Sequence, residues 1–158
     1  MACNRPGTPL PKPSGEHTLR QELIEETFPI FLLEIEREEC LFQSVEAIAD
    51  YLREHIEAHP SARYIATFDH FAHTRELPEG QVADSIHSAI NLVFCFGLTL
   101  QEPETLAIRP RSIGICDSGD RFIITFMEPP MPVVNAAMEH WAHSLIKRPK
   151  PACAMRAS

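Results

Sequence analysis

Two short histidine tetrads, residues 70–73 (HFAH) and 140–143 (HWAH), are the parts of this chain best suited to chemistry. The chain has 8 histidines among 158 residues. Imidazole changes its charge near neutral pH and is a common metal ligand, so clustered histidines indicate proton transfer or metal binding. Which of these a tetrad can do depends on the elements that position it.

The first tetrad lies in a segment, 63–74, that is rich in aromatic and β-branched residues and therefore predicts a strand. In a continuous strand His70 and His73 face opposite sides, which argues against a shared metal. Asp69 and His73 would then share one face, where the carboxylate could orient the imidazole. If the strand instead ends at Phe68, a turn brings both histidines together.

A metal site requires more ligands than this pair supplies. His87, on the next predicted element, is the obvious additional ligand or general base. The candidate metal ligands are therefore His70, His73 and His87, with a divalent metal as the cofactor. Together with Asp69, these residues define a candidate site for a metal-dependent or histidine-based enzyme.

The other paired histidines lie on predicted helices, where their spacing favours surface positions. His55 and His59 are four residues apart, but Ile56 stands where the H-E-x-x-H motif needs a glutamate. His140 and His143 fall on the outer flank of a helix, away from its apolar stripe. Neither pair has a predictable further metal ligand.

Two arginines and a cysteine add further candidates. Arg109 and Arg111 have same-face spacing in a predicted strand, so they could clamp a small anionic ligand or pair with nearby carboxylates. The candidate ligand-binding residues are therefore Asp69, His73, Arg109 and Arg111. Cys116 precedes the tip of a predicted hairpin, and redox sensing by its thiol is a weaker hypothesis.

Composition narrows the class of protein. The formal net charge is −8, from 14 basic and 22 acidic residues, which disfavours binding to nucleic acids or anionic membranes. The five cysteines include no C-x-x-C pair, so reduced thiols in the cytoplasm are the simplest interpretation. Membrane-spanning runs, phosphate-binding loops and nucleophile-elbow motifs are absent from the sequence.

The chain divides into a proline-rich N-terminal tail (1–15), a single folded domain (16–148) and a C-terminal tail (149–158), and we expect both tails to be flexible. Capping residues and apolar periodicity predict the elements of the domain. The expected helices cover 18–27, 44–59, 80–97 and 133–147, and the expected strands cover 30–37, 63–74, 106–116 and 121–127. The segment 92–100 fits a strand equally well.

This order suits an α+β two-layer sandwich, with a mostly antiparallel sheet of about four strands and helices packed on one face. The other face is then free to mediate dimerisation. Because no complete catalytic set is present, the first hypothesis is a non-enzymatic, dimeric binding or interaction protein that meets a protein partner or a small anion. The alternative is the enzyme with its site around Asp69, His70, His73 and His87, and both hypotheses stay open at this point.

Overall fold

The computed structural model describes residues 29–148. Within this range the chain forms five strands, three α-helices and one short 3-10 helix. In chain order the elements are β1 (Ile30–Glu36), α1 (Val45–Ala58), β2 (Ala62–Asp69), α2 (His70–Glu76), β3 (Ser88–Phe96), η1 (Pro103–Ala107), β4 (Arg111–Asp117), β5 (Arg121–Met127) and α3 (Pro132–His143). The predicted helix over 18–27 and both predicted tails lie outside the described residues.

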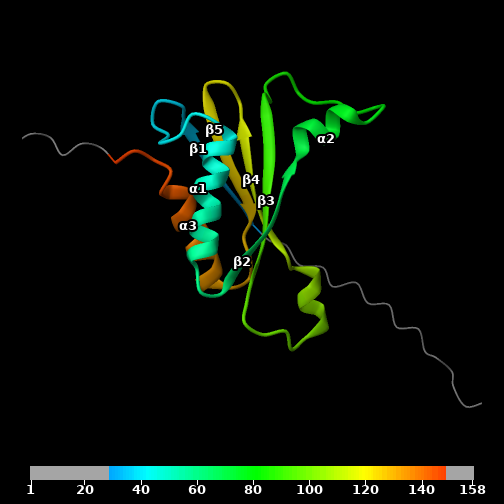
Figure 1. Ribbon diagram of the computed structural model, residues 1–158, viewed down its shortest axis with the longest axis vertical. Coiled ribbons are helices and arrows are strands. Elements are labelled where there is room, and N and C mark those ends of the chain that lie inside the picture. Colours follow the sequence, from blue (N-terminus) through cyan, green and yellow to red (C-terminus); the bar gives the residue numbers. More distant parts are fainter. Residues whose placement is uncertain (1–28, 149–158) are drawn as a thin grey trace, which may run out of the picture.

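All five strands pair in one antiparallel sheet, in the order β1-β5-β4-β3-β2. The strands β1 and β2 therefore lie at opposite edges, although only α1 separates them in the chain. Both α1 and α3 lie on one face of the sheet, whereas α2 and η1 project on the other side (Figure 1). The α+β class is confirmed, with five strands instead of about four; α1 and α3 pack on one face as predicted, whereas α2 contacts β3 from the other side.

The helix α1 forms where the sequence predicts it. Ser44 caps its first turn, because the Ser44 hydroxyl accepts a hydrogen bond from the Ala47 N–H at 3.2 Å. Apolar residues at helical spacing form one buried stripe, made of Val45, Ile48, Ala49, Leu52 and Ile56. The helix ends at its C-cap, His59, because Pro60 follows and the residue before a proline avoids helical geometry.

The core lies between the sheet and these two helices. Inward positions alternate along the strands, as in β3, where Ile90, Leu92, Phe94 and Phe96 are buried. Trp141 of α3 stacks on Phe96, with ring centroids 5.5 Å apart and planes 11° apart. The intervening strand positions therefore point away from α1 and α3.

The predicted strand over 30–37 and the predicted hairpin are confirmed as β1 and as the β4-β5 pair. In β1 the side chains of Phe31, Leu33 and Ile35 turn inward and the glutamates turn outward, as the alternation predicted. Glu34 and Glu36 instead meet Arg121 of β5 on the outer side.

The helix predicted over 80–97 is wrong, because Ser88–Phe96 is strand β3 and the residues before it form no helix. The alternative of a strand over 92–100 is confirmed for residues 92–96 only. The strand β3 lies between β2 and β4, whose side chains partly shield it on both faces, and it carries apolar residues on both. The nearly continuous apolar run that results mimics helical spacing. Gly97 ends a strand rather than a helix, with a φ of 125° and its N–H donating to the Ser61 carbonyl at 2.9 Å.

Other predicted boundaries also differ from the structure. The strand over 63–74 ends at Asp69, where α2 begins. The strand over 106–116 begins only at Arg111, because its first residues belong to η1 and the loop after it. The last helix ends at His143 instead of residue 147, and Ile146 forms a bridge to Cys40.

Candidate functional site

The face of the sheet opposite α1 and α3 lies outside the core that these two helices cover (Figure 1). Cross-strand pairs align its side chains in rows, one of which contains Leu32, Thr125, Gly114, Asn91 and Phe68. Small and polar residues occupy the middle of this row, and large apolar residues occupy both ends. We call this surface the uncovered face, meaning that neither α1 nor α3 packs on it; α2 contacts its β2 end, through Phe68.

Exposed apolar side chains gather at the β1 end of the uncovered face. Ile30 is 70% exposed and Leu32 is 58% exposed. Met127, which pairs with Ile30 across the strands, is 53% exposed. We call Ile30, Leu32 and Met127 the β1 patch. Leaving large apolar side chains in water is unfavourable, so a contiguous patch of them indicates a contact surface.

The first histidine tetrad lies at the other end of the same face. Its two imidazoles both pack against Phe68, with centroid distances of 4.6 Å for His70 and 5.2 Å for His73. Of the two alternatives that the sequence left open, the structure is nearer to the early end of the strand, but β2 ends at Asp69 instead of Phe68, and a helix, α2, follows in place of a turn. Asp69 serves as the N-cap of α2, and its carboxylate accepts a hydrogen bond from the Ala72 N–H at 2.8 Å.

The capping role of Asp69 can be tested directly. Asp69→Ala removes the hydrogen-bond acceptor at the first turn of α2. Loss of an N-cap lowers the stability of a helix by about 1 kcal/mol. We expect amide hydrogen exchange at Ala72 and His73 to become about fivefold faster, since local opening depends on the free energy of the cap. Asp69→Ser retains a capping oxygen and should restore slow exchange; unchanged exchange in Asp69→Ala would contradict the assignment.

His87 contacts a different part of the sheet. The backbone N–H of His87 donates to the backbone carbonyl of Asp117 at 2.9 Å. Its ring lies so close to Gly119 that a Cβ at that position would stand 2.9 Å from the imidazole Cε1. Within residues 29–148 no group of three or more histidine, cysteine, aspartate or glutamate side chains is placed to hold a metal ion.

The two arginines occupy different environments. Arg111 is only 7% exposed, and its guanidinium donates to the carbonyls of Ile108 and Met127. Burial lowers the pKa of Arg111, because desolvation disfavours the charged form. Arg109 donates to the Thr99 carbonyl at 2.9 Å. The Arg109 guanidinium thus holds a loop carbonyl, and the Arg111 guanidinium ties the Ile108 carbonyl, just after η1, to the end of β5.

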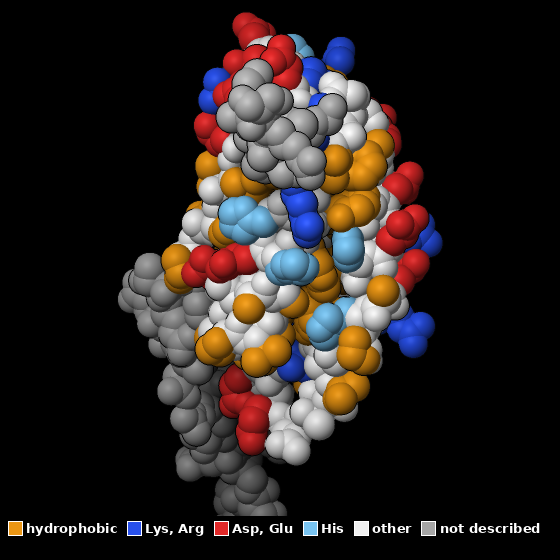
Figure 2. Space-filling model, turned by 90° about the vertical axis from the view of Figure 1, so that its left-hand side faces the viewer, with side chains coloured by type: hydrophobic (Ala, Val, Ile, Leu, Met, Phe, Trp, Pro, Cys, Tyr) orange, Lys and Arg blue, Asp and Glu red, His pale blue; other side chains and the backbone are white. Residues whose placement is uncertain are grey.

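The remaining paired histidines belong to α1, to its C-cap and to α3. Tyr51 of α1 and Ser144 after α3 are joined by a hydrogen bond of 3.2 Å between their hydroxyls, and His55 packs edge-on against Tyr51. Histidine side chains gather on the face that α1 and α3 form (Figure 2). His140 and His143 are exposed there, as the helical periodicity predicted.

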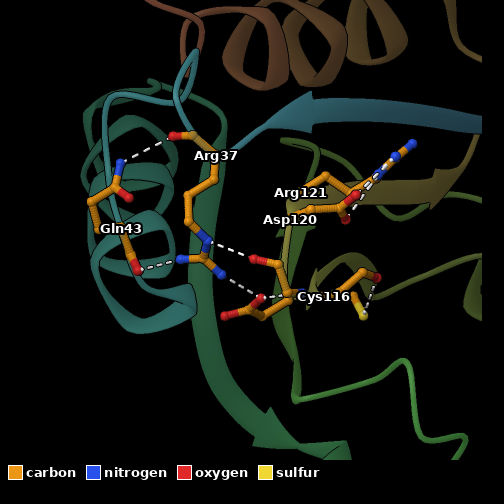
Figure 3. Close-up of polar contacts among 8 residues, drawn as sticks. Arg37, Gln43, Cys116, Asp120 and Arg121 are labelled. Atoms are coloured by element: carbon orange, nitrogen blue, oxygen red, sulfur yellow. Dashed lines mark hydrogen bonds and ion pairs between the residues drawn. The ribbon is translucent and has the colours of Figure 1, made fainter.

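Sequence reasoning missed a polar cluster at the β4-β5 hairpin (Figure 3). Arg37 donates to the Asp117 carboxylate at 2.5 Å, to the Gly119 carbonyl at 2.8 Å and to the Gln43 carbonyl at 3.0 Å. The same guanidinium lies over the Phe122 ring, 4.5 Å from its centroid. No local pattern marks this cluster, because Arg37 and Asp117 are 80 residues apart in the chain.

Cys116 lies on the uncovered face beside this hairpin. Burial raises the pKa of its thiol, and the Asp117 charge adds to this effect, while the Ser118 hydroxyl at 3.9 Å opposes it. A thiol with a raised pKa holds less of the reactive thiolate at neutral pH. The geometry therefore does not favour redox sensing at Cys116.

These features define a two-layer α+β domain with one sheet face that α1 and α3 leave uncovered (Figure 1). The chain belongs to a family of unknown function, DUF6858, whose model matches residues 19–147. Neither the curated proteins nor the solved structures contain a match to this chain. No helix among residues 29–148 has the length and apolarity needed to cross a membrane.

Proposed function

We propose that this protein is a non-enzymatic binding protein that acts as a homodimer. The observation that carries the proposal is the β1 patch, in which Ile30, Leu32 and Met127 expose more than half of their surface side by side. Apolar surface of this kind is stabilised when a partner covers it. The cytoplasmic location and a small anionic ligand at Arg109 and Arg111 stay predictions.

A second copy of the chain suits this patch for two reasons. The patch lies at an edge of the sheet, so two copies can approach about a two-fold axis without moving α1 or α3. The acidic neighbours of the patch are partly neutralised, because Arg121 forms ion pairs with Glu34 at 2.9 Å and with Glu36 at 3.7 Å. Like-charge repulsion between two acidic chains is thereby reduced at this place.

Analytical ultracentrifugation of the full chain over a range of concentrations tests the proposal. We expect a reversible dimer, and we expect Leu32→Glu to raise its dissociation constant at least tenfold, because a carboxylate would be buried in the contact. Leu77→Glu is the matched control: Leu77 is also an exposed leucine, but it lies beyond the opposite edge of the sheet, after α2. A strictly monomeric wild-type chain would overturn the proposal.

The metal-dependent or histidine-based enzyme has weaker support. It rests on the pair His70 and His73, which share contacts with Phe68. Asp69 is engaged as a helix cap, and His87 contacts Gly119 and Asp117 instead. No observation on the described residues assigns a reaction to this pair, so we do not propose one.

A further inference from the structure

We infer that the two copies join by pairing their β1 strands antiparallel, edge to edge, into one ten-stranded sheet. This inference rests on the proposed homodimer and specifies its contact. The backbone of β1, and not only its side chains, is then part of the interface. Strand addition of this kind supplies main-chain hydrogen bonds in a fixed register.

The backbone groups available for such pairing follow from the bonds that β1 already makes. At the two ends of its ladder with β5, the Arg37 N–H donates to the Asp120 carbonyl and the Glu128 N–H donates to the Pro29 carbonyl, both at 2.9 Å. Antiparallel strands direct alternate residues toward the same neighbour. Odd-numbered residues of β1 therefore face β5, whereas Ile30, Leu32 and Glu34 direct their N–H and C=O groups toward the edge on which no strand of residues 29–148 pairs.

The two edges of the sheet differ in how well they could accept another strand. β1 pairs with β5 over seven consecutive positions without a shift. β2, at the other edge, has a register shift between Tyr64 and Ala66. Such irregularities bend an edge and discourage pairing with another chain. The regular edge is thus the one that also carries the β1 patch.

A two-fold axis at Leu32 gives the best register. Leu32 then pairs with the same residue of the partner, and Ile30 pairs with Glu34 of the partner. The two Glu34 side chains stay about 13 Å apart, at roughly 3.3 Å per residue, and each keeps its own Arg121. Since even-numbered side chains point to the uncovered face, the two Leu32 side chains contact each other across the axis, and each β1 patch is thereby partly covered by the partner's.

A proline at position 32 separates this edge contact from other ways of dimerising. The Leu32 N–H points to the open edge, so Leu32→Pro removes a donor of the interface without breaking the ladder to β5. We expect Leu32→Pro to raise the dimer dissociation constant at least tenfold while the circular dichroism spectrum is retained. Leu32→Ala, which keeps the N–H, should raise it less.

Two more variants distinguish edge pairing from contact between whole sheet faces. Ser112 is exposed in β4 in the middle of the uncovered face, so Ser112→Glu should leave an edge-paired dimer intact. Leu32→Cys should form a disulfide between the two copies under mild oxidation, since paired Cα atoms would lie about 5.5 Å apart, within disulfide reach. Peptide mapping by mass spectrometry identifies the 32–32 bond and separates it from links through native cysteines.

The possible outcomes separate the inference from the proposed function. A monomeric wild type overturns both. A dimer that survives Leu32→Pro, or that forms no 32–32 disulfide, keeps the proposed function and overturns edge pairing. Loss of the dimer in Ser112→Glu likewise points to contact between sheet faces and overturns edge pairing. The disulfide result still decides the question if Leu32→Pro does not fold.

Discussion

Replacing Arg111 with alanine should lower the free energy of unfolding by about 3 kcal/mol. The side chain is 7% exposed, and its guanidinium is the donor for the carbonyls of Ile108 and Met127. Truncation leaves these acceptors without their donor and opens a cavity, each of which costs about 1 to 3 kcal/mol. Removal of the buried charge offsets part of this loss.

Urea unfolding, followed by the fluorescence of Trp141, the single tryptophan of the chain, measures this change. Arg111→Lys should give an intermediate loss, because an ammonium group cannot reach two carbonyls in the fixed geometry of a guanidinium. Arg121→Ala is the control on the outer side of β5, where three ion pairs lie in solvent, and it should change stability far less. Equal losses in Arg111→Ala and Arg121→Ala would show that burial does not decide the role of Arg111.

Asp117→Asn should lower the free energy of unfolding by about 1 to 2 kcal/mol at pH 7 and by much less near pH 3. Burial of the Asp117 carboxyl raises its pKa, but the hydrogen bonds from Arg37 and the Gly119 N–H, with the charges of Arg37 and His87, outweigh burial and lower it. A depressed pKa in the folded state stabilises the protein above the unfolded pKa of about 3.9. This contribution is lost as the pH falls through the folded pKa.

Denaturant unfolding of wild type and variant between pH 3 and pH 7 tests the pH dependence. The difference between their free energies of unfolding should be constant near neutral pH and should shrink below about pH 4. Asp84→Asn is the matched control, because Asp84 is an exposed carboxylate outside the Arg37 cluster and the substitution changes the net charge equally. A difference that persists unchanged at pH 3 would show that the charge of Asp117 does not matter.

Local sequence patterns predicted the elements whose surroundings match their own periodicity. Alternation in β1 and the capped apolar stripe of α1 each identify a buried face, and the structure buries these faces. The glycine-containing loop between β4 and β5 likewise predicted a hairpin. These elements suffice for the α+β class, since a half-buried sheet and an amphipathic helix must pack on one another.

The segment before Gly97 could not be predicted in the same way. β3 lies between two other strands, so side chains on both of its faces are at least partly buried. Its sequence therefore lacks the alternation of apolar and polar residues that marks a half-exposed strand. Ala89 and Val93 on its outer side then complete an apparent helical stripe with Ile90. Strand pairing, which depends on distant residues, overrides this local pattern.

For the functional surface, the sequence alone determined which residue types are present, including the histidine tetrads and the closely spaced arginines, whereas the first tetrad lies in α2 and Arg109 lies before β4, outside the strands predicted for them. Only the tertiary structure decided which of them meet. Sheet pairing joins Arg37 to Asp117 and brings the Arg111 guanidinium to the Met127 carbonyl of β5. Contacts between residues far apart in the chain depend on strand order and register, and periodicity within one segment holds no information about either.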